Sequence, residues 1–287
     1  METTPPNLRS GSSLRLLNKV PEVTVYFWVI KVLCTTVGET AADYLNTNLD
    51  LGLEGTGLLM AALLAAALVV QFRARKYVPG IYWLAVVLIS VVGTLLTDFL
   101  TDTLNVPLKV STLIFAVALA ATFGAWFAVE RTLSIHAITT SRREGFYWLA
   151  ILFTFALGTA AGDLVAERFD VGYWPSAMLF AAAIAAIALS RYGLRLNAVL
   201  AFWGAYILTR PLGASLGDFL SQSPDDGGLG LGTTGTSVTF LAVVLVVVVY
   251  LTLTRKDAAE KRHPDGEQNP LDEDAGDRVE NDTVALH

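Results

Sequence analysis

One short pattern occurs four times along this chain of 287 residues. In each copy a tryptophan is followed ten residues later by a glycine, and five residues after the glycine comes an aspartate. The segments around the glycine and the aspartate read VGETAADYL, VGTLLTDFL, LGTAAGDLV and LGASLGDFL. Successive aspartates are 55, 65 and 55 residues apart, so the first two copies map onto the last two. This register predicts four tandem repeats, in which a hairpin was doubled and the pair was doubled again.

The composition indicates that these repeats cross a membrane. The chain is 54% hydrophobic and 16% charged, with a mean hydropathy of +0.54, which is more apolar than soluble domains usually are. Apolar runs of roughly 20 residues, the length that spans a bilayer as a helix, recur along nearly the whole chain. We therefore predict an all-α polytopic membrane protein, with eight transmembrane helices formed by four tandem hairpins and an internal pseudo-twofold duplication.

The predicted parts of the chain follow the repeats. They are an N-terminal arm (1–22), a first transmembrane half with repeats 1 and 2 (23–130), a linker (131–145), a second transmembrane half with repeats 3 and 4 (146–255) and a disordered acidic tail (256–287). Basic residues gather in the loops on one side of the membrane. The positive-inside rule therefore places the arm, the linker, the tail and both termini in the cytoplasm. The four tryptophans are predicted to form an aromatic belt at the cytoplasmic interface.

Each repeat places a carboxylate inside a predicted transmembrane helix, where an ionised group costs at least a few kcal/mol. Four such groups at one depth need a reason, and we expect them to face one another or a water-filled cavity. Oxygen ligands of this kind suit hard cations such as Mg²⁺, Ca²⁺ and Mn²⁺. The predicted metal ligands are therefore Asp43, Asp98, Asp163 and Asp218.

Other polar residues lie on the same helix faces as the aspartates, because residues four apart share one side of a helix. Three of them precede an aspartate by one turn and are predicted to contribute to ion binding: Glu39, Thr94 and Thr159. The second helix of each predicted hairpin begins with a hydroxyl, at matching positions in the first three repeats and after a five-residue insertion in the fourth. These residues are Thr56, Ser111, Ser176 and Thr236.

Two cations within the predicted helices, Lys31 and Arg210, are predicted to compensate the charge of the carboxylates. Lys31 is also near enough to the interface for its amino group to extend to water. The repeated glycines fit the small-xxx-small pattern that lets transmembrane helices pack closely. They are Gly38, Gly93, Gly158 and Gly213. A purely structural role of the aspartates is the alternative to ion binding.

No cofactor and no enzymatic activity are predicted. The single Cys34 excludes an internal disulfide and a cysteine metal cluster, and none of the three histidines falls inside a predicted helix. Intramembrane aspartyl proteases use a pair of membrane aspartates, one of them in a Gly-x-Gly-Asp word. The words that end in Asp163 and Asp218 lack the first glycine of that pattern.

Four tandem two-helix repeats, each with a tryptophan and a G-x-x-x-x-D word, resemble the bacterial membrane proteins built from a "repeat of unknown function". Such proteins are often described only as uncharacterised membrane-anchored proteins. The resemblance covers residues 23–255. It implies a bacterial inner-membrane protein of eight helices, and it implies no particular activity.

The function that these residues favour is transport or export of a hard divalent cation (Mn²⁺, Mg²⁺ or Ca²⁺) by the cluster of four aspartates. One alternative is a cation channel or a proton-coupled carrier of a small solute. Another is a membrane scaffold that transports nothing. The predicted partners are the lipid bilayer and the small cation, with protons and a second copy of the chain left open. Nucleic acid is not among them.

Overall fold

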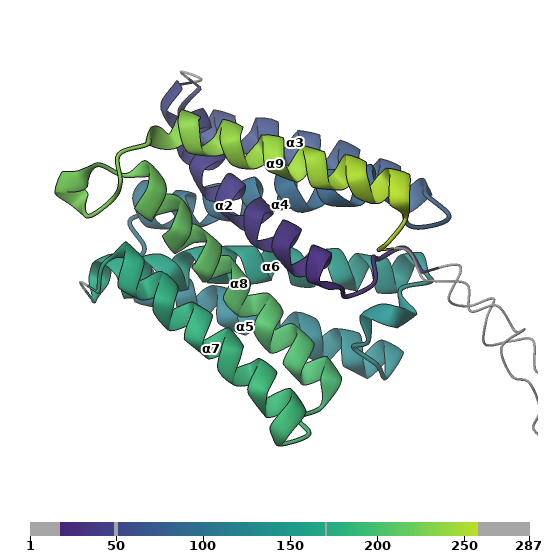
Figure 1. Cartoon of the computed structure of the whole chain (residues 1–287). Helices are drawn as coiled ribbons and strands as arrows, with labels where there is room; N and C mark the ends of the chain where they lie inside the picture. The colour runs from purple at the N-terminus through teal and green to yellow at the C-terminus, as the bar shows by residue number, and fades with distance from the viewer. Residues whose placement is uncertain (1–17, 49–50, 170, 258–287) are drawn as a thin grey trace, which may run out of the picture.

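The computed structural model describes residues 18–48, 51–169 and 171–257, except for the side chains of residues 137, 167 and 168. Most of the predicted arm and of the predicted tail therefore lies outside the described residues. Within the described part the chain is all-helical, as predicted (Figure 1). The eight long helices are α2 (Val25–Asn48), α3 (Gly52–Arg73), α4 (Pro79–Asp98), α5 (Leu108–Glu130), α6 (Ser141–Asp163), α7 (Tyr173–Gly193), α8 (Ala198–Ser221) and α9 (Gly232–Thr254).

The helices form an inner ring and an outer layer. The first helix of every repeat belongs to the ring, in which α2, α4, α6 and α8 pack in this order and α8 packs back against α2 (Figure 1). The outer helices α3, α5, α7 and α9 bury only 17–22% of the residues in their most apolar windows. Because the ring helices carry the repeated glycines and aspartates, the fold turns these residues toward the protein interior.

Each outer helix packs mainly on the ring helix of the following repeat. Helix α3 covers α4, α5 covers α6, and α7 covers α8. The last outer helix, α9, packs on α2, the first ring helix (Figure 1). The repeats are therefore interlocked in a cycle, and contact between the two ends of the chain closes it.

The repeated glycines set the spacing of the ring. Each of them receives the side chain that lies three residues before the glycine of the next repeat, and a methyl group at any of the four would overlap that side chain. A residue without a Cβ atom is therefore required at each contact. The four pairs are Gly38 with Ser90, Gly93 with Phe155, Gly158 with Arg210, and Gly213 with Thr35.

The start of α6 differs from the sequence-based expectation. The predicted linker 131–145 is shorter in the structure, because α6 already begins at Ser141 and places Arg142 and Arg143 in its first turn. The Thr140 hydroxyl caps this helix by accepting the backbone N–H of Arg143 at 3.3 Å. At their other ends, α4 and α6 continue into π-helical turns over Phe99–Thr103 and Leu164–Arg168. These turns directly follow the aspartates of repeats 2 and 3.

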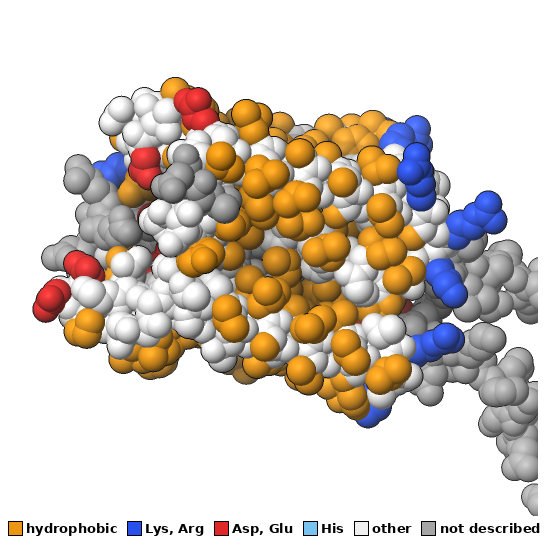
Figure 2. Space-filling view, turned by 90° about the horizontal axis from the view of Figure 1, so that it is seen from above, with side chains coloured by type: hydrophobic (Ala, Val, Ile, Leu, Met, Phe, Trp, Pro, Cys, Tyr) orange, Lys and Arg blue, Asp and Glu red, His pale blue; other side chains and the backbone are white. Residues whose placement is uncertain are grey.

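The surface is that of a protein suited to a membrane. Seven of the described helices are long and apolar enough to cross one, and α8 is the long helix outside this set. Apolar side chains cover the sides of the molecule, and most of the exposed charges lie at its two ends (Figure 2). We call these the basic end, which carries Arg73, Arg75, Lys76, Arg191, Arg195 and Arg255, and the acidic end, which carries Glu54, Asp102, Asp225 and Asp226.

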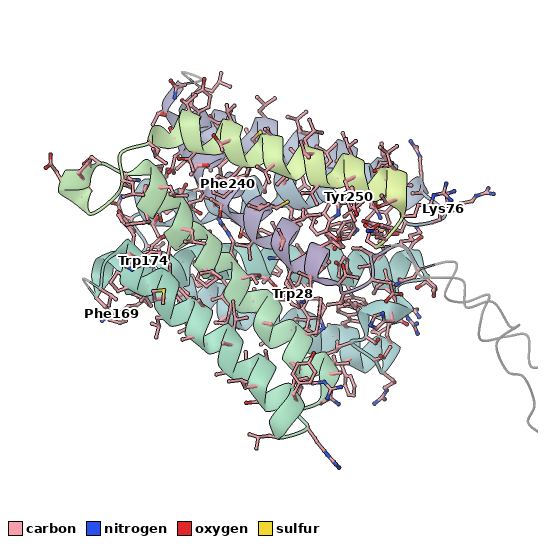
Figure 3. All side chains as sticks on the ribbon, viewed as in Figure 1. Trp28, Lys76, Phe169, Trp174, Phe240 and Tyr250 are labelled. Atoms are coloured by element: carbon pink, nitrogen blue, oxygen red, sulfur yellow. The ribbon has the colours of Figure 1, made fainter. Side chains whose placement is uncertain are left out.

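The predicted aromatic belt is wrong for three of the four repeat tryptophans. Trp83, Trp148 and Trp203 expose at most 5% of their surface, because they lie on the inward faces of the ring helices. Tyr82 packs against Trp83 and Trp148, and Tyr147 packs against Trp148 and Trp203. These side chains form an aromatic cluster in the half of the ring next to the basic end. Exposed aromatic side chains instead include Trp174 and Phe169, which lie toward the opposite end from Lys76 (Figure 3).

Buried polar contacts join separate parts of the chain at the basic end. Lys19 donates to Glu144 Oε2 at 2.7 Å and to the Phe72 carbonyl at 3.0 Å. The Tyr77 hydroxyl donates to the Asp257 carboxylate just after α9. Removal from water raises the pKa of Tyr77 and of Asp257, whereas the hydrogen bond from Tyr77 by itself favours the ionised form of Asp257. These bonds hold the described ends of the chain against the start of the ring.

The ring predicts that a methyl group at a repeat glycine is much more harmful than one on the outer layer. A Cβ atom at Gly93 would lie 2.7 Å from Phe155 Cβ and 3.2 Å from the Ala156 backbone nitrogen, so the helices must separate. Gly93→Ala is therefore expected to destabilise the fold by about 1–3 kcal/mol. The measurement is thermal unfolding of the detergent-solubilised protein.

Gly124→Ala is the matched control, because Gly124 lies inside the outer helix α5 and has open space where the methyl group would be. Equal melting temperatures for the two variants would show that close helix approach at Gly93 is not needed.

Candidate functional site

The guanidinium of Arg210 is fully buried between the four ring helices. Its Nη1 donates to the Thr35 carbonyl at 2.8 Å. Its Nη2 lies 2.6 Å from Glu39 Oε2 and 2.8 Å from Thr159 Oγ1, and Thr94 Oγ1 is a further close partner. One cation therefore joins α8 to α2, α4 and α6.

The repeat register explains why these partners meet. Glu39, Thr94 and Thr159 each directly follow the motif glycine of their repeat. Because the ring helices pack on one another in the same register, equivalent side chains converge on the axis. Arg210 occupies the position three residues before the glycine of repeat 4, and its stem fills the space at Gly158. A single departure from the repeat pattern thus places a cation among three oxygen-bearing side chains.

Three carboxylates lie together beside this cation, toward the acidic end. Glu39, Asp163 and Asp218 each offer a carboxylate oxygen, and these oxygens lie within 4.8 Å of one another. Glu39 and Asp218 are buried, whereas Asp163 is half-buried. We call these three residues the carboxylate trio. They come from α2, α6 and α8, and Glu39 Oε2 forms an ion pair with Arg210 Nη2 at 2.6 Å.

The trio overlaps the predicted metal ligands without matching them. Asp163 and Asp218 belong to it, but Asp43 and Asp98 are half-buried residues outside it. Glu39, predicted to contribute to ion binding, supplies the third carboxylate from a position one turn deeper in α2 than Asp43. The other two residues predicted to bind the ion, Thr94 and Thr159, contact the Arg210 guanidinium.

Lys31 precedes Thr35 by one helical turn in α2, and its side chain is fully buried. Its amino group donates to Thr209 Oγ1 at 3.0 Å. It also lies 4.4 Å from the centre of the Phe155 ring and 4.2 Å from that of Tyr206. Arg210 thus forms the ion pair expected of a charge-compensating residue. Lys31 is held by a hydroxyl and two aromatic faces, and among the described residues it forms no ion pair.

The aromatic side chains around the axis were not identified from the sequence. Phe155 and Tyr206 enclose Lys31, and the hydroxyls of Tyr82 and Tyr147 lie 2.5 Å apart in a buried hydrogen bond. A signal for part of this cluster exists in the repeat. The residue before every motif tryptophan is aromatic: Phe27, Tyr82, Tyr147 and Phe202.

A buried hydroxyl lies near the start of each outer helix, at the matching positions noted in the sequence. All four expose at most 2% of their surface and have no hydrogen-bond partner within the described part of the chain. The residue after two of these hydroxyls bonds to a ring helix: Thr112, after Ser111, donates to the Ala160 carbonyl, and Ser237, after Thr236, donates to the Thr40 hydroxyl. Buried hydroxyls without protein partners are sites where ordered water can bind. They are Thr56, Ser111, Ser176 and Thr236.

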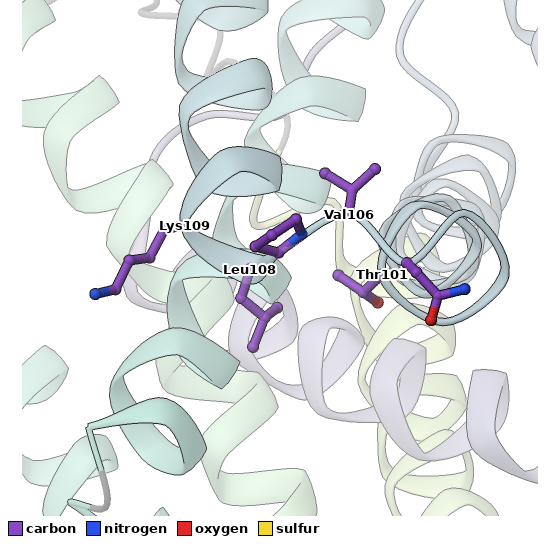
Figure 4. Close-up of a pocket in the computed structure, with 6 residues that line it drawn as sticks. Thr101, Val106, Leu108 and Lys109 are labelled. Atoms are coloured by element: carbon purple, nitrogen blue, oxygen red, sulfur yellow. The ribbon is translucent and has the colours of Figure 1, made fainter.

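A separate open depression lies at the acidic end, between the π-helical turn after α4 and the start of α5 (Figure 4). Its lining includes Thr101, Val106, Leu108 and Lys109. None of the residues that line it belongs to the carboxylate trio, and its cation is Lys109. The depression therefore offers no oxygen cluster for a metal ion.

The comparison with protein families decides what kind of chain this is. The family model described as Repeat of Unknown Function (DUF347) matches four times, at residues 26–77, 81–132, 146–196 and 201–257. The chain belongs to this family. Its four matches coincide with the four ring-and-outer helix pairs, which confirms the predicted four repeats. No curated protein and no solved structure matches the chain.

Removing the central guanidinium is expected to destabilise the ring strongly. Arg210→Met leaves the buried Glu39 without its cation, and an unpaired buried charge typically costs about 3–5 kcal/mol. Adding Glu39→Gln to this variant should recover part of the loss, because the uncompensated charge is gone. The measurement is the free energy of unfolding of the two variants in detergent.

Arg142→Met is the control, because Arg142 pairs with Glu130 at the basic end and its side chain is 67% exposed. Such a pair contributes less than about 1 kcal/mol. A loss no larger in Arg210→Met than in Arg142→Met would contradict a central structural role for Arg210.

Proposed function

We propose that this protein transports a hard divalent cation, Mn²⁺, Mg²⁺ or Ca²⁺, and that the carboxylate trio binds the ion. The observation that carries the proposal is the convergence of carboxylate oxygens from α2, α6 and α8 within 4.8 Å of one another. Carboxylate and hydroxyl oxygens are the ligands that hard cations prefer. No enzymatic step is part of the proposal.

The local charge supports a cationic substrate. When ionised, Glu39, Asp163 and Asp218 carry three negative charges, and Arg210 beside them carries one positive charge. Within this group the acidic side chains outnumber the basic one, which favours a cation as the substrate.

The position of the trio supports alternating access. The trio lies in the half of the ring near the acidic end, and the aromatic cluster fills the half near the basic end. Transporters built from repeats bind their substrate near the middle of the membrane and expose it to one side at a time. By the positive-inside rule the basic end is cytoplasmic, and we propose that both termini lie there, in a bacterial inner membrane.

A scaffold that transports nothing is the second candidate function. It is favoured by Arg210, whose bonds join all four ring helices as a structural lock would. The two candidates differ in what the loss of a trio carboxylate does. A transporter loses ion flux while its fold persists, whereas a lock loses stability first.

The test is metal flux into liposomes that contain the purified protein, with Mn²⁺, Mg²⁺ and Ca²⁺ compared. Residues that only support metal ligands already change affinity by about 10–100-fold, so loss of a ligand should do at least as much. Asp163→Asn and Asp218→Asn are therefore expected to reduce flux at least tenfold at limiting ion concentration, without a comparable loss of thermal stability.

Asp102→Asn is the matched control, because Asp102 is an exposed aspartate at the acidic end outside the trio. It should keep the flux of the unaltered protein. Absence of flux for every ion in the unaltered protein, with lower stability in the two trio variants, would favour the scaffold.

A further inference from the structure

Two buried cations lie near each other on the ring axis, and their surroundings differ. Arg210 has hydrogen-bond partners on three other helices, including the Glu39 carboxylate. Lys31 has one hydrogen bond, to the Thr209 hydroxyl, and two aromatic faces. Among the described residues no carboxylate pairs with Lys31. The positive charge of Arg210 is thus compensated locally, and a positive charge on Lys31 is not.

The groups that face Lys31 make its protonated form costly. The nearest titratable neighbours are Cys34 on its own helix and Tyr206 and Arg210 on α8, with Phe155 of α6 completing the enclosure. Tyr82 of α4 and Tyr147 of α6 lie beyond Tyr206. A buried ammonium without a paired anion is unfavourable, but a lysine can lose its proton, whereas an arginine stays charged.

The geometry couples Lys31 to the carboxylate trio. The Phe155 ring is shared, because Lys31 Nζ lies 4.4 Å and Arg210 Cζ 5.6 Å from its centre. The Thr35 hydroxyl also bonds to the Thr209 carbonyl at 3.3 Å, next to the Thr209 side chain that holds Lys31. Arg210 thus links the two, because it pairs with Glu39 of the trio and is also an electrostatic neighbour of Lys31. A cation bound at the trio would add positive charge to this group, which disfavours the charged form of Lys31.

Buried hydroxyl groups lie between Lys31 and the basic end. The Lys31 amino group is over the Tyr206 ring, and the Tyr206 hydroxyl lies close to Tyr147. Tyr147 is in turn hydrogen-bonded to Tyr82. Hydroxyls both donate and accept hydrogen bonds, so these tyrosines can take part in moving a proton. The Tyr206 hydroxyl has no hydrogen-bond partner among the described residues, so the path from Lys31 toward the basic end also needs ordered water beside Tyr206.

We propose that Lys31 is the proton-binding group of the carrier. When the trio binds a divalent cation, the Lys31 ammonium loses one proton and becomes a neutral amine, and the proton leaves toward the basic end. When the cation is released, Lys31 takes up a proton again. The inference rests on the proposed function, and it makes the protein a cation–proton exchanger.

The test is calorimetric titration of the full-length protein in detergent with Mn²⁺, in buffers that differ in ionisation enthalpy. The number of protons released per bound ion follows from the difference between the buffers. By proton linkage the unaltered protein is expected to release about one proton per Mn²⁺. The Lys31→Met variant has a side chain of similar volume but no titratable amino group. It is expected to bind Mn²⁺ without releasing a proton.

Two further variants separate charge from position. Lys31→Arg keeps a charge that cannot be lost, so it should weaken Mn²⁺ binding and also abolish proton release. Lys109→Met removes an exposed lysine at the acidic end and should leave both quantities unchanged. Proton release that persists in Lys31→Met would overturn the inference while the proposed function stands. Failure of the unaltered protein to bind Mn²⁺ would overturn both.

A second measurement needs no variant and applies even where Lys31→Met does not fold. If ion binding expels a proton, the affinity of the unaltered protein for Mn²⁺ must rise with pH, by up to about tenfold per pH unit while the group titrates. An affinity that does not change between about pH 6 and 9 overturns the inference.

Discussion

The close approach of neighbouring ring helices at four glycines is the constraint on which the rest of the structure depends. Each glycine leaves room for one side chain of the next repeat, and the contact repeats around the ring until repeat 4 meets repeat 1. Polar residues that follow the glycines are thereby brought to one axis. The same register that gives a close-packed bundle also assembles the polar centre, so the helix packing and the polar centre share their geometry.

Two cations with different surroundings lie at this centre. Arg210 replaces a small or aromatic side chain of the other repeats, and its guanidinium is bonded on several sides. Lys31 has a single hydrogen bond and an aromatic enclosure. A permanently charged, well-bonded group suits the fixed part of an ion site. A weakly bonded lysine suits a group whose charge changes during a cycle.

The repeat pattern predicted the helices well because glycine, tryptophan and aspartate recur at fixed spacing within long apolar runs. It also predicted that the carboxylates of different repeats approach one another, and two of the expected ligands, Asp163 and Asp218, lie together. It did not predict that Glu39 takes the third place while Asp43 and Asp98 stay outside. One helical turn decides which carboxylate reaches its neighbours, and that depends on helix crossings between residues far apart in the chain.

The sequence by itself determined the number of repeats, the eight helices, their apolar character and the candidate polar residues, because each of these is a local or periodic property. Only the tertiary structure decided that every outer helix covers the next repeat and that α9 closes the ring on α2. It also buried three tryptophans that were expected at the interface. Periodicity tells which face of a helix is small or polar, but the choice of the neighbouring helix that packs there is made by the whole chain.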